Sequence, residues 1–169
     1  HNLFKIEREC AESKHPISFQ PILGDIRDKT LLHRVFASFK PHVVFHAAAY
    51  KHVTLLENNI REGVVNNIFG TYIVAQAALD LNVKSFILIS SDKAVRPTSV
   101  MGATKRISEL IIQGLSKKNE TGSYNLGSPI RFAIVRFGNV LGSSGSVIPL
   151  FKKQILEGGP ITITHPEAT

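Results

Sequence analysis

The sequence predicts a doubly wound α/β fold, in which a parallel sheet is covered by helices on both faces. Short apolar segments rich in β-branched residues alternate with longer segments whose apolar residues recur at helical spacing. The short segments are almost continuously apolar, which is typical of parallel strands buried on both faces. The helical segments between them are long enough to return the chain to the same edge of a sheet.

The expected elements follow one another in that alternating order. They are a helix at 29–39, introduced by Gly24 and Asp25, a strand at 42–46, a helix at 57–81, a strand at 84–90, a helix at 101–116, a strand at 131–137, a helix at 147–156 and a short strand at 161–164. In the helix at 101–116, one buried face is expected to hold Ile107, Leu110, Ile111 and Leu115.

Composition limits the class of partners. The chain has 169 residues, 43% of them hydrophobic, which is enough for one ordinary core. Its single cysteine, Cys10, excludes an intramolecular disulfide and a thiolate metal site and favours a reducing compartment, the cytoplasm. No apolar run approaches the roughly 18 residues that span a bilayer. The formal charge of +7 comes from scattered Lys and Arg without a nucleic-acid motif, so we expect an anionic small ligand and no nucleic acid.

Three histidines, His42, His46 and His52, surround the strand expected at 42–46. No carboxylate or thiolate stands at ligand spacing from them, and His46 and His52 flank a loop instead of sharing a helix face. We therefore expect no metal site. Two of the three are expected to pack or to form hydrogen bonds.

Ligands of doubly wound sheets bind beyond the carboxyl ends of the strands, which here are the loops after Phe45, Ile89 and Val135. The second of these loops contains Ser90-Ser91-Asp92-Lys93. Met101 and Lys105, in the following helix, are four residues apart and share one helix face. We expect both side chains to point towards the Ser91-Asp92-Lys93 loop.

Five sequence blocks carry a resemblance to a known family. They are His46-Ala-Ala-Ala-Tyr-Lys-His-Val53, Asn67-x-x-Gly70-Thr71, Ser90-Ser-Asp-Lys-Ala-Val-Arg-Pro-Thr98, Met101-Gly-Ala-Thr-Lys-Arg106 and Arg136-Phe-Gly-Asn-Val-Leu-Gly-Ser-Ser-Gly-Ser-Val-Ile-Pro149. From about Asn2 to its end, the chain resembles the polysaccharide-biosynthesis branch of the extended short-chain dehydrogenase/reductase superfamily, the nucleotide-sugar 4,6-dehydratases that act on UDP-N-acetylhexosamines. The superfamily normally has Tyr-x-x-x-Lys where this chain has Met101 and Lys105. A long-form subgroup of the dehydratases resembles this sequence in having Met there, and core packing is the alternative reading of Met101.

The resemblance implies NAD as cofactor and a UDP-N-acetylhexosamine as substrate, with hydride passing from C4 of the sugar to NAD+ and returning to C6 after water leaves. It implies Asp92 as the acid for the C6 oxygen and Lys93 as the base for C5. Ser91 would hydrogen-bond the C4 oxygen, and Lys105 would hold the nicotinamide ribose. Met101 has no proton to exchange, so the base for the C4 hydroxyl stays open between Lys93, Lys105 and water. The acid must keep its proton and the lysine must shed one, so Asp92 needs a raised pKa and Lys93 a lowered pKa.

Cofactor contacts are also implied by the resemblance. Asp25 would accept a hydrogen bond from the adenine amino group with Ile26 beside the ring, although Asp25 could instead be a helix cap. The small side chains of Ala47, Ala48 and Ala49 would let the dinucleotide approach, with Asn67 bracing their loop, and tight strand–helix packing is the alternative. The expected cofactor contacts are completed by Ser90, Lys105 and Phe137.

Substrate contacts are expected from Lys51, Asn139, Ser143, Ser146 and Val147. The loop at 142–146 precedes a helix, and the free amides of a helix N-terminus suit a phosphate, so UDP is expected there. A flexible turn is the alternative for this loop. For Lys51, a cofactor contact and simple solvation are the alternatives.

We interpret residues 1–169 as a partial NAD-binding, Rossmann-like domain truncated at both ends, with 139–169 beginning the substrate-binding part. The strand, glycine-rich turn and helix that normally open such a domain are not in the sequence. We therefore expect weak or absent NAD binding and no activity by this chain alone. We also expect exposed sheet edges that favour a homo-oligomer or a rearranged sheet. The parent protein could be tethered to the inner face of the cell membrane. A UDP-sugar 4-epimerase or reductase on the same scaffold, and a non-catalytic fragment, remain alternatives.

Overall fold

A three-stranded parallel sheet organises the chain. The computed structural model describes residues 2–12, 18–121, 129–140 and 147–161. Its strands are β1 (Val43–His46), β2 (Ser85–Ser91) and β3 (Arg131–Phe137), in the spatial order β1-β2-β3. Both strand pairs are parallel, and the register places Ser90 of β2 beside Arg136 of β3. The expected class of an α/β fold with a parallel sheet is confirmed, and each strand lies within one residue of its expected bounds.

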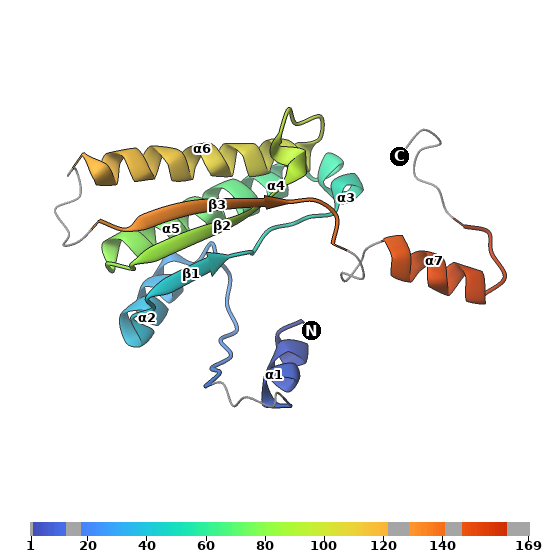
Figure 1. Cartoon of the computed structure of the whole chain (residues 1–169), viewed down its shortest axis with the longest axis horizontal. Coiled ribbons are helices and arrows are strands. Elements are labelled where there is room, and N and C mark those ends of the chain that lie inside the picture. Colours follow the sequence, from blue (N-terminus) through green and yellow to red (C-terminus); the bar gives the residue numbers. More distant parts are fainter. Residues whose placement is uncertain (1, 13–17, 122–128, 141–146, 162–169) are drawn as a thin grey trace.

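The helices connect the strands in the expected alternation (Figure 1). They are α1 (Asn2–Ala11), α2 (Lys29–Phe39), α3 (Val53–Glu57), α4 (Ile60–Gly63), a π-helical turn η1 (Val64–Phe69), α5 (Gly70–Asp80), a 3₁₀ turn η2 (Asp92–Ala94), α6 (Val100–Glu120) and α7 (Val147–Leu156). Helices α2 and α7 have the bounds expected from the sequence, whereas α1 and α3 were not expected. None of the helices in the described part of the chain combines the length and the apolar character that crossing a membrane requires.

The single helix expected at 57–81 is interrupted near its start. Helix α3 ends at Glu57, where the amides of Asn58 and Asn59 donate to the carbonyls of Thr54 and Leu55, four residues earlier in each case. Asparagine amides that bond to nearby backbone compete with helix continuation. The chain restarts as α4 and then runs through the π-helical turn into α5.

The core lies between one face of the sheet and helices α5 and α6. Phe86 and Leu88 of β2 are completely buried there, together with Ala77 and Ala78 of α5 and Ile112 of α6. Burial alternates along β2, because successive side chains point to opposite faces of the sheet.

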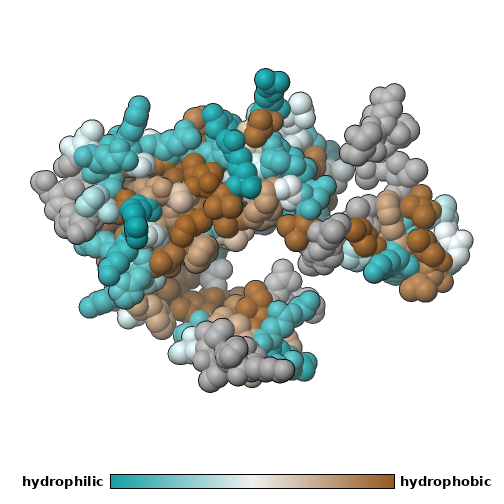
Figure 2. All heavy atoms as spheres, in the orientation of Figure 1, coloured by the Kyte–Doolittle hydropathy of each residue, from teal (hydrophilic) through white to brown (hydrophobic). Residues whose placement is uncertain are grey.

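In the described part of the chain, helices cover one face of the sheet and leave the opposite face open, which differs from the expected cover on both faces. Within the described ranges, Phe45 is 70% exposed and Val135 is 45% exposed on that face. Helices α1 and α7 lie apart from the sheet (Figure 1), and apolar atoms follow the strands in Figure 2. The strands are therefore apolar on both faces of the sheet, but only one of these faces is covered by helices in the described residues.

The buried face of α6 also differs from the expected one. Ile107 and Leu110 are 43% and 49% exposed, respectively. The buried positions of the helix are instead Met101, Gly102, Thr104, Ser108, Glu109, Ile112 and Leu115. Small and polar side chains occupy this face because they find hydrogen-bond partners on neighbouring elements, as Ser108 does with the carbonyl of Asn67. Of the strand expected at 161–164, Ile161 is described and is not in a strand, and the other residues lie outside the described part.

Candidate active site at the carboxyl edge of the sheet

The loop after β2 folds back on itself as a compact charged turn. Ser91 caps the 3₁₀ turn, and its hydroxyl donates to Oδ1 of Asp92 at 2.9 Å. The same oxygen accepts from the backbone N–H of Lys93 at 2.8 Å and from its Nζ at 3.1 Å. The strand end thus holds a carboxylate that accepts hydrogen bonds from both a hydroxyl and an ammonium.

The loop after β3 joins this turn. Lys93 Nζ also donates to Oδ1 of Asn139 at 3.1 Å, although the two residues are 46 positions apart. Gly138 lies against the carboxyl group of Asp92, because a Cβ at position 138 would be 3.4 Å from Asp92 Oδ2. Two of the three strand-end loops singled out in the sequence therefore meet, and Asp92 and Asn139 are both exposed to solvent there.

The pKa of Asp92 is lowered, chiefly by the hydrogen bond from Ser91 and then by the one from Lys93. The acid role expected for Asp92 requires a raised pKa, so the observed shift has the opposite direction. The carboxyl group is exposed and ion-paired with Lys93, and both conditions favour its charged form.

Lys105 projects from α6 to the same strand. Its Nζ donates to the carbonyl of Ile89 at 2.9 Å, two residues before Ser91. Burial lowers the pKa of Lys105, and the charge of Glu109 acts in the opposite direction. Met101, one helical turn earlier, is 5% exposed, so its thioether lies in the interior. Met101 and Lys105 both lie on the inner side of α6, as their spacing predicts.

The first turn of α6 packs directly against the charged turn. A Cβ at Gly102 would strike the backbone carbonyl oxygen of Lys93 and would also lie 3.2 Å from Cβ of Pro97. Ser99 caps the helix by accepting a hydrogen bond from Gly102 N. Only a residue without a side chain lets the helix approach the Lys93 backbone this closely.

Asn67 braces the loop after β1, as the sequence predicts. Its Oδ1 accepts from Tyr50 N at 2.8 Å, and its Nδ2 donates to Tyr50 O at 3.0 Å and to Thr104 Oγ1 at 3.1 Å. Asn67 is 1% exposed and lies in the π-helical turn. The wide turn lets a helix side chain hold the loop, and Ala47 and Ala48 of that loop remain exposed.

The side chain of Ser90 points into the interior, where it meets a charged cluster that the sequence reasoning missed. Its hydroxyl donates to Oε1 of Glu109 at 2.6 Å, and Arg136 and Arg106 donate to the same carboxylate. Burial alone would raise the pKa of Glu109, but the hydrogen bonds from Arg136, Ser90 and Arg106 outweigh it and lower the pKa to about 2. The available signal was a carboxylate four residues after Lys105, on the same helix face.

Of the three histidines, His46 is buried, and His42 and His52 are exposed. His46 Nε2 lies 2.9 Å from Thr71 Oγ1, whose hydroxyl donates to the carbonyl of Asn67. The expectation that two of the three pack or form hydrogen bonds is thus confirmed for His46. No group of three potential metal ligands occurs in the described ranges.

Of the two roles expected for Asp25, an adenine contact and a helix cap, the structure contradicts the helix cap. Asp25 does not cap α2, because Asp28 is the N-cap and accepts from Leu31 N. Arg27 instead binds the Asp25 carboxylate through its guanidinium and its backbone N–H, with the shortest distance 2.7 Å. Ile26 packs against the core and against Gly70 of α5. An adenine amino group would have to share the Asp25 carboxylate with Arg27.

The remaining expected site residues are located as follows. Phe137 ends β3 and is 46% exposed, and Lys51 is exposed in the loop after β1. Val147 begins α7, and its side chain is not described. Ser143 and Ser146 lie outside the described residues, and so does the loop at 142–146.

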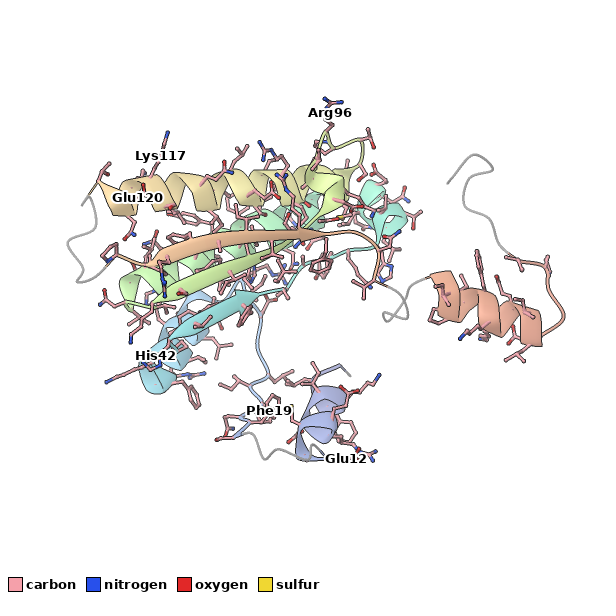
Figure 3. The ribbon with its side chains drawn as sticks, viewed as in Figure 1. Glu12, Phe19, His42, Arg96, Lys117 and Glu120 are labelled. Carbon is pink, nitrogen blue, oxygen red and sulfur yellow. The ribbon has the colours of Figure 1, made fainter. Side chains whose placement is uncertain are left out.

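The structure contains a hollow of about 410 Å³ at the amino end of the strands, lined by residues that include Lys40, His42 and Lys84. His42 marks that end of the sheet in Figure 3, and Arg96 marks the end with the charged turn. The cluster around Lys93 thus lies on an open surface at the other edge of the sheet.

Solved structures share this arrangement of elements. The X-ray structure of Pen from Bacillus thuringiensis superposes with a TM-score of 0.81 at 39% identity, over 97% of this chain and 49% of that one. A dTDP-glucose 4,6-dehydratase from Streptomyces venezuelae, solved with NAD bound, gives a TM-score of 0.67 at 25% identity, over 82% of this chain and 45% of that one. The fold is that of the extended short-chain dehydrogenases/reductases.

The chain belongs to the polysaccharide biosynthesis protein family, whose model matches residues 1–169. It is 49% identical to the capsular polysaccharide biosynthesis protein CapD of Staphylococcus aureus, over 100% of this chain and 27% of that protein. It is 41% identical to a UDP-N-acetylglucosamine 4,6-dehydratase (inverting) of Campylobacter jejuni, over 85% of this chain and 41% of that protein. It is also 37% identical to a UDP-glucose 4-epimerase of Rickettsia rickettsii, over 87% and 41%. The chain thus spans less than half the length of these curated relatives.

Proposed function

We propose that this chain carries the catalytic strand ends of an NAD-dependent nucleotide-sugar 4,6-dehydratase that acts on a UDP-N-acetylhexosamine. The observation that supports this most directly is the meeting of Asp92, Lys93 and Asn139 at the carboxyl edge of the sheet, beside the strand that Lys105 contacts. Eliminating water from a sugar requires an acid and a base on adjacent carbons, and Asp92 and Lys93 are such a pair. The relatedness to a UDP-N-acetylglucosamine 4,6-dehydratase supports the same activity.

The residues present fit a dinucleotide at this edge. Ala47 and Ala48 are exposed and small, in a loop that Asn67 holds at both its N–H and its carbonyl. Lys105 uses one N–H on the carbonyl of Ile89, and an ammonium has two more to donate to a ribose. When bound, NAD would supply the acceptor and later the donor of a hydride.

The chain's own residues then have separate tasks. Ser91 would orient the C4 oxygen of the sugar, Asp92 would donate a proton to the departing C6 oxygen, and Lys93 would take the C5 proton. In the structure Asp92 and Lys93 form an ion pair, in which Asp92 lacks the proton that the acid must donate and Lys93 carries the proton that the base must have lost. We propose that the sugar displaces this pairing, because covering an exposed carboxylate removes the solvent that favours its charged form.

We place the whole protein's catalytic part in the cytoplasm, with a UDP-sugar as its small-molecule partner and with self-association into a homo-oligomer. A lone cysteine is consistent with a reducing compartment.

The decisive experiment incubates the intact protein that contains this chain with UDP-N-acetylglucosamine and NAD+ and measures the product mass. Loss of one water supports the dehydratase. Lys93→Met and Asp92→Asn should each lower turnover by roughly a hundredfold or more. Lys84→Met, which removes an exposed lysine at the amino end of β2, is the matched control and should leave turnover unchanged.

The main alternative is a sugar-nucleotide 4-epimerase, which the 37% identity to a UDP-glucose 4-epimerase favours. An epimerase needs no acid and base for eliminating water, so its product would keep the mass of the substrate. A C4 epimer of unchanged mass, formed by both Asp92→Asn and wild-type protein, would replace the dehydratase proposal with this one.

A further inference from the structure

Glu109 lies beneath the site, and none of the roles proposed above uses it. Its side chain is fully buried on α6, one helical turn after Lys105. Oε1 accepts from Ser90 Oγ at 2.6 Å and from Arg136 Nε at 2.7 Å. Oε2 accepts from Arg136 Nη2 at 2.6 Å and from Arg106 Nη1 at 3.0 Å.

These bonds tie together the three elements that carry the proposed site. Ser90 and Arg136 are direct neighbours across β2 and β3. Ser90 comes immediately before Ser91-Asp92-Lys93, and Arg136 comes three residues before Asn139. Because the Glu109 carboxylate of α6 binds a residue on each of the two strands, it sets the relative positions of the two loops that meet at Lys93. The two-point contact with Arg136 also fixes the orientation of the carboxylate.

Stability alone does not account for this cluster. A buried charge that is paired gains little over well-packed apolar residues of similar volume, because the buried group loses its hydration. Arg136 and Arg106 remain 39% and 38% exposed, while Glu109 is shielded completely. The cluster therefore places one desolvated negative charge at a defined point next to a lysine of the proposed site.

We propose that Glu109 is a positioning residue, which fixes the ends of β2 and β3 against α6 and keeps the Lys105 ammonium charged and directed at the carbonyl of Ile89. The catalytic consequence rests on the proposed function. The geometric and electrostatic consequences for Lys105 do not depend on it.

The groups that face Lys105 come from each neighbouring element. Lys105 lies close enough to His46 of β1 for its charge to lower the pKa of that ring, and Glu109 acts on Lys105 from its own helix. Strand β2 contributes the uncharged carbonyl of Ile89. Asn67 of the π-helical turn bonds to Thr104, the neighbour of Lys105 in the chain, and is also uncharged. Strand β3 contributes Arg136, whose positive charge is paired with Glu109. Glu109 is thus the negative charge in this set, and it opposes the burial that lowers the pKa of Lys105.

The first test measures the protonation of Lys105 directly in the intact protein. A small acylating reagent is applied over a range of pH, and modification of Lys105 is followed by peptide mass spectrometry. In Glu109→Gln, the unprotonated fraction and hence the rate of modification at neutral pH should rise severalfold. In Arg106→Gln, the carboxylate is less neutralised and the rate should fall.

A merely structural role predicts a different pattern. Both variants would then lower the melting temperature and leave the pH dependence of Lys105 modification in the folded protein unchanged, which would overturn the proposal. The opposite signs of the two variants cannot arise from general loosening. If Glu109→Gln does not fold, Arg106→Gln decides alone, because it removes a partly exposed side chain.

Turnover gives a second readout. Glu109→Gln should lower kcat about tenfold with a smaller change in KM, and should move the pH limb that depends on Lys105 to lower pH. Absence of turnover in wild-type protein would count against the proposed function, while the modification experiment would still decide the role of Glu109.

Discussion

His46 shows how a buried residue makes stability depend on pH. Burial, and then the nearby charge of Lys105, lower the pKa of His46 to about 4 from its usual 6.5. Because the hydroxyl of Thr71 donates to Asn67, its oxygen accepts from His46 Nε2, and the ring is neutral with its proton on Nε2.

The sign of the effect follows from the two protonation states. Between pH 6.5 and 4, the unfolded chain binds a proton that the folded chain does not, so the contribution is complete above about 6.5 and is lost as pH falls. Lowering the pH from 7 to 5 should therefore reduce the free energy of unfolding by about 2 kcal/mol through protonation of His46 in the unfolded chain. Urea unfolding at both pH values should show this loss in the wild-type chain and a smaller one in His46→Gln. An equal loss in both would assign the pH dependence to other groups.

The direction of the Asp92 shift can be tested at the same scale. The hydrogen bond from Ser91 is the largest cause of its lowered pKa, so Ser91→Ala should raise the pKa of Asp92. A carbon-detected NMR titration of the aspartate carboxyl groups measures this shift. Ser116→Ala, which removes an exposed hydroxyl that bonds to Glu120, is the control and should leave Asp92 unchanged. An unshifted Asp92 in Ser91→Ala would mean that this hydrogen bond is absent in solution.

At the scale of elements, the two glycines of α6 distinguish the effect of helix propensity on stability from the effect of packing. Replacing a helical glycine by alanine stabilises a helix by roughly 0.5–1 kcal/mol where space allows. Gly114 has no atom within 4 Å of an added Cβ, so Gly114→Ala should stabilise by about that amount. At Gly102, the added Cβ meets the backbone oxygen of Lys93, which cannot rotate away. Gly102→Ala should therefore destabilise by about 1–3 kcal/mol and lower turnover in the intact protein. Thermal unfolding of the two variants side by side checks the opposite signs, and a stabilised Gly102→Ala would show that the Lys93 backbone is free to move.

The positions of the helices and strands were largely predictable because they depend on local periodicity. Which elements their side chains contact was not predictable. The bounds of α2, β3 and α7 follow from apolar spacing and flanking breakers. The buried face of α6 did not follow, because its inward residues include Ser108 and Glu109, whose hydrogen-bond partners lie on other elements. Asn67 was predicted to brace the loop at Tyr50, but the π-helical turn that lets it do so leaves no mark on apolar periodicity.

At the scale of the whole molecule, the parallel pairing of the strands was predictable, but the faces of the sheet that the helices cover were not. Alternating strands and helices require crossovers and hence parallel strands, and they place Asp92 and Asn139 on one edge. The pKa directions at that edge depend on distances that spacing cannot supply. Continuously apolar strands predict helices on both faces, but in the described ranges one face of the sheet is open. We expect this open face to determine whether the chain self-associates in solution.

The open face of the sheet should make the isolated chain self-associate. Its exposed apolar side chains include Phe45, Val135 and Phe137, at 70%, 45% and 46% exposed, and the outer edges of β1 and β3 are unpaired in the described sheet. Burying one such side chain contributes about 1.5–3 kcal/mol, so each lysine substitution at Phe45 or Val135 should weaken association roughly tenfold or more. Sedimentation velocity over a range of concentrations measures this. The control is Leu110→Lys, since Leu110 is 49% exposed on the outer side of α6, away from the sheet. If Leu110→Lys dissociates the chain while Phe45→Lys and Val135→Lys leave it associated, the contact runs through the helices and the open sheet face is not what drives association.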